Sequence, residues 1–382
     1  MREITRKTVF RRIAAVLVLL IVAGGLGLWW IMQQPMYRPP GLAQMDIKDP
    51  IGASADLTDA DSRVSRGRWE VEPGVELSHF SVGEGTNILV VHGGPGIPQT
   101  ASAPAFDVLG DAYRLHYYAQ RGTGESFRPT FDFSGSRWAS IQALEGTLGI
   151  GQQLADIERI RRLLGDQRLI LVGHSYGALL AALYAAEMPD RVMALLLIAP
   201  ADLVVFPSLH GGLFDNLRDR LAEAERTAYD AWLEEYLDLG EIFTETEAEL
   251  AGRDSELIHF FEAAGWEAPA AVSPPPSQVG AWHARAQYFS MGLRHDYSDA
   301  LGRITAPTLV VHGGDDLQPI EVAEDYCRWI ADSEIVTIPG AGHFPHYTHG
   351  EALAPVVRAF LDGLTDGKGR PVGLMSNPAR ER

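Results

Sequence analysis

The chain has 382 residues, of which 46% are hydrophobic, so it can form one large folded domain with an appendage. Its formal net charge of −18 and its isoelectric point near 5.1 would repel phosphate backbones, so nucleic acid is not an expected partner. Cys327 is the only cysteine, which excludes an intramolecular disulfide, and the Cys/His spacing of a structural zinc site is absent. We expect neither a metal nor a cofactor.

The N-terminal part contains an uncharged stretch from Ile13 to Met32, long enough for a helix that crosses a bilayer. Residues 1–12 are basic and little positive charge follows the stretch, so we expect residues 1–12 in the cytoplasm and the remainder outside. A cleavable signal peptide is the alternative, but the exit WWIMQQPMY lacks its small-residue cleavage site. The sequence therefore predicts a single-pass protein of the cell membrane, anchored by a transmembrane helix at 13–32.

The next segment, residues 33–68, has several prolines and little periodicity, which predicts a linker. From Trp69 onward, turns at Pro73-Gly74 and at 83–85 predict an antiparallel entry to a sheet. Short apolar runs then alternate with helical patterns, which is typical of an α/β fold with a mostly parallel sheet flanked by helices. The runs that predict buried strands are 88–92, 114–118, 169–173, 194–199 and 308–313.

This alternation stops at residues 201–301, where the sequence is helical and acidic. An unstructured loop of that length would be unusual in a compact protein, so we expect an inserted helical cap domain. The core would then comprise residues 69–200 and 302–366. A polar segment, 367–382, is expected to form a flexible tail.

The motif Gly173-His174-Ser175-Tyr176-Gly177 lies between an apolar strand run and a helix-forming run. G-x-S-x-G in this context predicts a nucleophile elbow with Ser175 as nucleophile. Glycines suit the tight turn, because side chains there would collide with the neighbouring strand and helix. The bare pattern is common by chance, so the strand-turn-helix context carries the prediction.

A second glycine-rich loop, residues 92–96 (HGGPG), directly follows a predicted buried strand. Preorganised backbone N–H groups stabilise the oxyanion of acyl-transfer intermediates. We assign this role to the N–H groups of Gly94 and of Tyr176, the residue after the nucleophile. A simple turn is the alternative for the loop. His92 is expected to be a structural hydrogen-bonding residue.

A serine nucleophile needs a base, and the base needs a carboxylate that orients it. His343 follows the predicted strand at 335–338 and is flanked by small residues, whereas His346 and His349 lie further into the next segment. Asp315 and Asp316 both follow the strand run at 308–313, and their position alone does not decide between them.

These motifs together resemble the prolyl iminopeptidase branch of the α/β-hydrolases, which are serine peptidases. The matching segments are HGGPG at 92–96, QRGTGES at 120–126, DIERIRRLLG at 156–165, GHSYG at 173–177, PTLVVHG at 307–313 and PGAGHFP at 339–345. The resemblance implies an α/β-hydrolase fold. It also implies an acid three residues after Gly313, which favours Asp316.

Two departures weaken the peptidase assignment. Ala119 stands where the family often has an aspartate that braces the second loop. Family aminopeptidases also hold the substrate's amino group with cap glutamates, and none of the cap glutamates here can be matched individually. Those considered are Glu234, Glu235, Glu241, Glu245, Glu247 and Glu249, and a solvated helix face is the alternative explanation for them.

The expected enzyme is a serine hydrolase in which Ser175 attacks an amide or ester, His343 is the base and Asp316 orients it. Gly94 and Tyr176 would hold the oxyanion. The resemblance implies an aminopeptidase that releases N-terminal residues such as proline from short peptides. A carboxylesterase on small or lipid-derived esters is the alternative. A third hypothesis, a non-catalytic binding protein tethered to the membrane, requires a missing triad residue, and all three are present.

Overall fold

A computed structural model describes residues 24–25, 27, 42, 45–54, 57–58, 64–203, 211–238, 240, 242–266, 268–292 and 294–365. The predicted tail at 367–382 lies outside these residues. So does the predicted transmembrane helix at 13–32, except for Gly24, Gly25 and Gly27. Within the described ranges, no helix is both long and apolar enough to cross a membrane.

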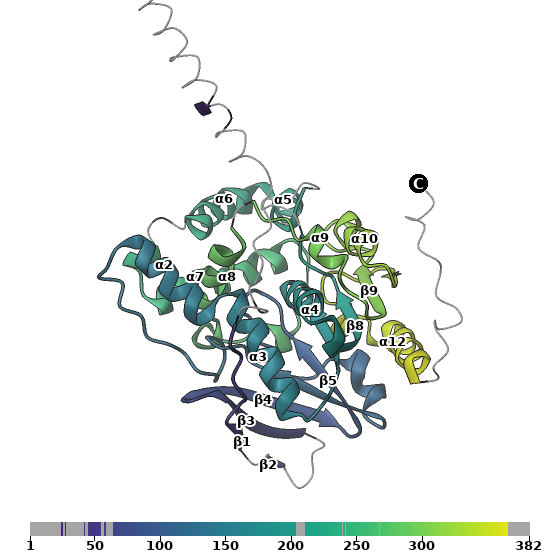
Figure 1. Ribbon diagram of the computed structural model, residues 1–382. Coiled ribbons are helices and arrows are strands. Elements are labelled where there is room, and N and C mark those ends of the chain that lie inside the picture. Colours follow the sequence, from purple (N-terminus) through teal and green to yellow (C-terminus); the bar gives the residue numbers. More distant parts are fainter. Residues whose placement is uncertain are drawn as a thin grey trace, which may run out of the picture.

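The described part of the chain contains a ten-stranded sheet in the order β1-β3-β4-β6-β5-β7-β8-β9-β10, with β2 paired to β3 (Figure 1). Pairing from β6 to β10 is parallel, and β1 to β4 form the antiparallel entry. The mostly parallel sheet is the one that the sequence predicts. The strands are β1 (Gly52–Ala53), β2 (Leu57–Thr58), β3 (Val64–Glu72), β4 (Val75–Gly83), β5 (Thr86–Val91), β6 (Tyr113–Tyr118), β7 (Leu169–His174), β8 (Val192–Ile198), β9 (Thr308–Gly313) and β10 (Ser333–Ile338).

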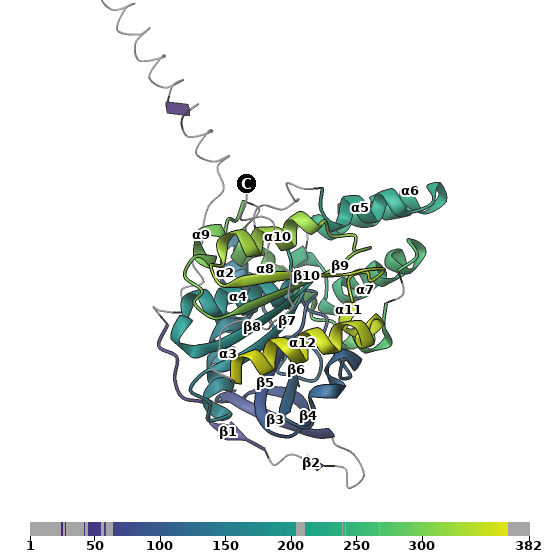
Figure 2. The ribbon, with the colours of Figure 1, turned by 90° about the vertical axis from the view of Figure 1, so that its right-hand side faces the viewer.

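Helices cover both faces of the sheet, as Figures 1 and 2 show. The α-helices are α2 (Arg137–Leu148), α3 (Ile150–Leu163), α4 (Tyr176–Glu187), α5 (Leu213–Arg220), α6 (Glu223–Leu237), α7 (Glu247–Ala263), α8 (Ala281–Met291), α9 (Ser298–Leu301), α10 (Ile320–Trp329), α11 (Pro345–Thr348) and α12 (Gly350–Thr365). The 3₁₀ helices are η2 (Pro104–Leu109), η3 (Pro189–Arg191), η4 (Ile242–Thr244), η5 (Ala270–Val272) and η6 (Pro276–Gln278).

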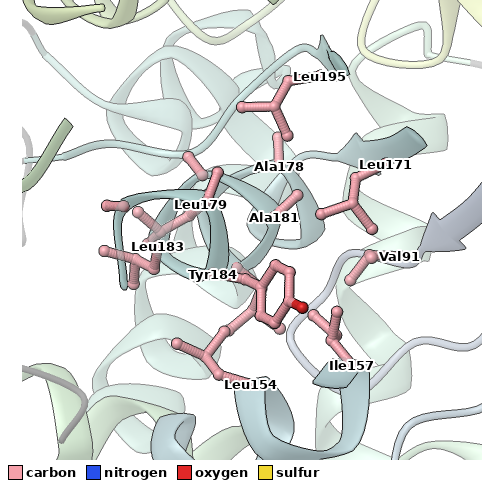
Figure 3. Close-up of a cluster of buried hydrophobic side chains, with 14 of the residues drawn as sticks. Val91, Leu154, Ile157, Leu171, Ala178, Leu179, Ala181, Leu183, Tyr184 and Leu195 are labelled. Atoms are coloured by element: carbon pink, nitrogen blue, oxygen red, sulfur yellow. The ribbon is translucent and has the colours of Figure 1, made fainter. Parts of the chain in front are cut away.

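The alternation of side chains along each strand divides the core between these two faces. In β7, Leu169 and Leu171 pack with α3, α4 and α10, whereas Ile170 and Val172 pack with η2 and α12. Because both faces are covered, β7 reads as a continuous apolar run. Figure 3 shows part of the apolar cluster that Leu171 forms with α3 and α4, where Tyr184 of α4 lies against α3.

The sheet begins earlier than the sequence predicts. β3 starts at Val64 rather than at Trp69, and Gly52–Ala53 pairs with it inside the segment expected to be a linker. Polar residues such as Ser65 and Arg66 hide this strand in the sequence. Their backbone N–H and C=O groups pair with those of β4, and this pairing cannot be predicted from the apolar pattern of residues 64–68 alone.

Between β8 and β9 the chain forms helices α5 to α9, in the interval for which a helical cap is expected. Figure 2 shows α5 and α6 extending away from the sheet. One apolar cluster joins α7 and α8 to Leu144 and Leu148 of α2, so the cap rests on a helix of the core. A second cluster is mainly aromatic and also includes Leu317, which follows the Asp315–Asp316 pair.

A buried ion network ties the entry strands to α3. Arg121 donates through Nε and Nη2 to Asp156, both at 2.6 Å, and Nη2 also reaches Glu72 at 2.8 Å. Arg159 completes the network, with bonds of 3.0 Å to Asp156 and 2.9 Å to Glu72. Two cations and two carboxylates therefore neutralise one another, with Arg121, Arg159 and Asp156 buried and Glu72 33% exposed.

Replacing Asp156 with Ala should destabilise the protein, because Arg121 and Arg159 would then share only Glu72. Removal of one partner from a buried ion network costs roughly 3–5 kcal/mol of unfolding free energy. Urea denaturation of the full-length protein measures this loss. The exposed Arg218–Asp230 pair is the control, and D230A should leave the midpoint nearly unchanged. Equal midpoints for the two variants would contradict the prediction.

Candidate active site

Ser175 lies at a sharp turn between β7 and α4, with φ 53° and ψ −121°. This backbone conformation is sparsely populated for a residue with a side chain, so the surrounding packing must maintain it. A Cβ on Gly177 would lie 2.1 Å from the Val91 carbonyl oxygen, and one on Gly173 would lie 2.5 Å from Ala178 Cα. Both glycines of the motif are thus required sterically.

His343 and Asp316 are in direct contact. The His343 Nδ1–H donates to the carboxylate, with distances of 3.0 Å to Oδ2 and 3.2 Å to Oδ1. Asp316 also accepts from the Gln318 N–H at 2.9 Å, whereas Asp315 is exposed. The structure therefore brings Asp316, and not Asp315, to the histidine. With Nδ1 engaged as a donor, Nε2 is left as the basic nitrogen.

The loops that carry these groups meet at the carboxyl end of β7. His174 Nε2 donates to the His343 carbonyl at 2.8 Å, and the two rings lie 5.0 Å apart. On the other side, a Cβ on Gly93 would lie only 3.0 Å from Ser175 Cβ. The Ser175 turn is therefore flanked by the His343 loop and by the HGGPG loop.

Of the two predicted oxyanion donors, Tyr176 lies at the turn after Ser175 and Gly94 lies in the HGGPG loop. Tyr176 is the first residue of α4, so its N–H is one of those that an α-helix leaves without an intrahelical partner. Its side chain is directed elsewhere, because the hydroxyl donates to Gln287 Oε1 at 2.9 Å. Gly94 is exposed and has φ +119°, a conformation that favours glycine.

His92 has the structural role that the sequence predicts. Its Nδ1–H donates to the Gly93 carbonyl at 2.9 Å, and its Nε2 accepts from the Gln120 N–H at 3.1 Å. Burial lowers the pKa of His92 to about 4, so the ring is neutral at neutral pH. It ties the HGGPG loop to the QRGTGES loop and performs no proton transfer in this position.

The QRGTGES loop is braced without the aspartate that Ala119 replaces. Ser126 Oγ donates to the Ala119 carbonyl at 2.6 Å and accepts from the Ser78 N–H at 2.9 Å. The Ala119 N–H in turn donates to the Ser78 carbonyl at 2.9 Å. Ala119 also borders a cavity of about 440 Å³ whose lining includes Arg66 and Arg68 but neither Ser175 nor His343.

The cap contributes a tryptophan that the sequence did not single out. Trp266 stacks on His343, with ring centroids 5.4 Å apart and an interplanar angle of 20°. A Cβ on Gly342 would lie 2.7 Å from Trp266 Nε1, so the glycine before the histidine allows this stacking. Nothing in the local sequence distinguishes Trp266 from the other cap aromatics. His343 is only 4% exposed beneath it.

The described cap glutamates are exposed or occupied by other partners. Glu245 pairs with Arg253 at 2.5 Å, and Glu247 pairs with Arg128 at 2.8 Å. Glu249 forms a capping box at the start of α7. The remaining described members are Glu234, which is exposed, and Glu235, which pairs with Arg253 at 3.4 Å and is 68% exposed, while Glu241 lies outside the described residues.

Comparison with known proteins identifies the family. A model of the alpha/beta hydrolase fold family matches residues 86–350, which is more than half of the chain. This chain belongs to the α/β-hydrolase family. It is therefore an α/β-hydrolase family enzyme. Across the described residues there is no cluster of three or more His, Cys, Asp or Glu side chains that could hold a metal.

Individual relatives of this α/β-hydrolase differ in activity. The chain is 27% identical to the proline iminopeptidase PfmaB of Pestalotiopsis fici, over 72% of this chain and 91% of that one. It is 28% identical to a pimeloyl-[acyl-carrier protein] methyl ester esterase of Neisseria meningitidis, over 51% and 58%. The proline iminopeptidase structure from Mycobacterium smegmatis has a TM-score of 0.53 at 20% identity, over 77% and 96%, which shows a shared fold.

The buried histidines predict how the stability of this hydrolase depends on pH. Burial lowers the pKa of His346 to about 3, whereas histidine in an unfolded chain titrates near about 6.5. Between these values the unfolded chain binds a proton that the folded chain does not, so stability falls as pH drops through this window. H346F removes one such group and should make the slope of unfolding free energy against pH shallower.

Urea denaturation of the wild type and H346F at several pH values from 7 to 4 measures both slopes. Phe should be tolerated, because neither ring nitrogen of His346 has a partner among the described residues. Identical slopes in the two proteins would contradict the assignment of His346 as a buried neutral group.

Proposed function

We propose that this protein is a serine carboxylesterase that works through an acyl-enzyme. The observation that carries the proposal is the hydrogen bond from His343 to Asp316, in a loop that contacts the residue before Ser175. An alcohol, an imidazole and a carboxylate in series are the groups that activate a serine.

In the proposed first step, His343 Nε2 accepts the Ser175 hydroxyl proton as Oγ attacks the ester carbonyl carbon. The carbonyl π electrons move to oxygen, and the N–H groups of Gly94 and Tyr176 donate to that oxyanion. Asp316 stabilises the imidazolium that forms. The intermediate collapses when His343 gives its proton to the departing alcohol, and the acyl group remains on Ser175.

In the second step, His343 removes a proton from water, which attacks the acyl carbon. Collapse of the second tetrahedral intermediate releases the acid and returns the proton to Ser175. Trp266 covers the imidazole in this scheme and limits the access of bulk water to it.

The preference for an ester over a peptide rests on the chemistry of the cap. The cluster above His343 is mainly aromatic and aliphatic. An aminopeptidase needs an available carboxylate for the substrate's ammonium group. The described cap glutamates are exposed or engaged with other groups, and the buried cap carboxylate of Asp254 is paired with Arg285. An aminopeptidase is the second candidate, because the HGGPG, GHSYG and PGAGHFP motifs and the relative PfmaB favour it.

Substitutions in the proposed triad should separate chemistry from folding. S175A is expected to lower kcat by roughly a million-fold, and D316N by roughly ten-thousand-fold, the losses found for other serine hydrolases. The control D315N changes the adjacent exposed carboxylate and should retain normal activity. Hydrolysis of a 4-nitrophenyl ester measures all three. Normal turnover by S175A, or equal losses in D315N and D316N, would contradict the assignment.

A side-by-side assay should distinguish the two candidate activities. We expect turnover of 4-nitrophenyl butyrate and little release of 4-nitroaniline from proline 4-nitroanilide, because no described cap glutamate is available for the ammonium group. The S175A protein provides the background rate for both reagents. A higher kcat/KM for the prolyl anilide than for the ester would favour the aminopeptidase and overturn the esterase proposal.

A further inference from the structure

Arg285 of α8 is a buried cation whose hydrogen bonds are incomplete. Its side chain is 1% exposed and pairs with Asp254 of α7 through Nη1 alone. Arg285 Nε and Nη2 have no partner among the described residues. Buried polar groups are nearly always hydrogen-bonded, so two unpaired guanidinium donors at this depth call for a partner that the described protein does not supply.

The two unpaired nitrogens lie on one edge of the guanidinium, where they form a fork that matches the two oxygens of a carboxylate. Other arginines of this chain fill that same edge. Arg121 binds Asp156 through Nε and Nη2, both at 2.6 Å, and Arg218 binds Asp230 through Nε and Nη2 at 2.6 and 2.8 Å. Arg285 differs because its partner, Asp254, is bound at Nη1, so the Nε–Nη2 edge stays unpaired among the described residues.

Arg285 belongs to the layer of cap side chains that covers the proposed triad. Its guanidinium carbon lies 5.4 Å from the Tyr236 ring centroid. Tyr236 shares its apolar cluster with Trp266, which stacks on His343. Two residues further along α8, Gln287 accepts a hydrogen bond from Tyr176, the neighbour of Ser175. Arg285 is 1% exposed and His343 is 4% exposed, so both lie beneath the surface of the protein.

Charged groups near Arg285 include Asp254 and Arg253. Asp254 neutralises its net charge at Nη1, and Asp254 Oδ1 has no partner among the described residues. The nearby Arg253 is engaged by Glu245 and Glu235. The Nε–Nη2 edge of Arg285 is therefore left without an acceptor among the described residues.

We propose that Arg285 binds a free carboxylate of the substrate, so that the preferred esters carry a second, ionised carboxyl group. This inference rests on the proposed esterase function. The carboxylate would accept two parallel hydrogen bonds from Nε and Nη2 while the ester carbonyl lies at Ser175. Arg285 thus acts as a specificity-determining residue, and the chemistry of ester cleavage is unchanged.

The test compares two esters of equal chain length, 4-nitrophenyl hexanoate and the mono-4-nitrophenyl ester of adipic acid, with S175A as the blank. Wild-type kcat/KM should favour the adipate ester by roughly tenfold to a hundredfold, the range expected for hydrogen bonds to a charged group. The butyrate ester of 3-hydroxybenzoate, with phenyl butyrate as its neutral partner, shows whether a carboxylate on the alcohol side is recognised instead.

Removal of the guanidinium alone would leave Asp254 unpaired, so the main variant is R285Q combined with D254N, which neutralises both groups. Its ratio of adipate to hexanoate kcat/KM should fall to about one. R285K keeps the charge without the fork and should reduce the ratio in part. D254N alone removes a nearby negative charge and should raise it. The control is R218Q with D230N, an exposed arginine–aspartate pair whose fork is already occupied, which should leave the ratio unchanged.

The ratio is the readout because a general loss of activity does not alter it. A wild-type enzyme with no preference for either carboxylate ester, or a preference that survives in the double variant, would overturn the proposal. Should the double variant fail to fold, R285K and D254N still test it, since equal ratios in both and in the wild type would overturn it as well. Failure of the wild type to hydrolyse any ester would instead contradict the esterase function.

Discussion

The close approach of β5 to the start of α4 constrains the rest of the site. Gly177 lies so near the Val91 carbonyl that a Cβ would come within 2.1 Å of it, and Gly173 is similarly confined by Ala178. The turn at Ser175 between these two glycines has an unusual backbone conformation, which the surrounding packing must maintain. The HGGPG loop continues from β5 and lies beside Ser175 through Gly93. The proposed nucleophile and the loop of the proposed oxyanion donor Gly94 are therefore next to the same backbone contact.

The cap and the proposed base form one packed unit. Trp266 reaches His343 only because residue 342 is glycine, and Leu317 joins the cap cluster immediately after Asp316. The other cap cluster includes two leucines of α2. The cap cluster therefore contacts both the imidazole, through Trp266, and the loop that carries Asp316, through Leu317.

Buried charge serves two purposes in this fold. In the Arg121–Asp156–Glu72–Arg159 network every cation has two carboxylates, which suits a structural role in joining β3 to α3. The Arg285–Asp254 pair is equally buried but has one contact and unused donors. A low-dielectric interior makes such an incomplete pair costly. The Arg121 network therefore suits a structural role, whereas the unpaired donors of Arg285 suit the binding of a ligand.

Much of the fold and part of the site follow from local sequence. Apolar runs predict β5, β7 and β9, because parallel strands covered on both faces need side chains of that kind. Ser175 and the flanking glycines are recognisable because a tight strand-to-helix turn restricts which residues fit. The expected order of serine, acid and histidine along the chain also predicts His343 as the base. It limits the candidates for the acid to Asp315 and Asp316.

The family resemblance favours Asp316 over Asp315, but only the tertiary structure shows which carboxylate contacts His343, since the directions of adjacent loop side chains depend on the rest of the fold. The same holds for Trp266 and for the Arg285–Asp254 pair, whose partners come from segments distant in the chain. The first residues of β3, 64–68, likewise lack apolar periodicity and are recognised as a strand only by their pairing with β4. Short-range patterns determine which elements form, whereas contacts between distant segments decide which side chains meet.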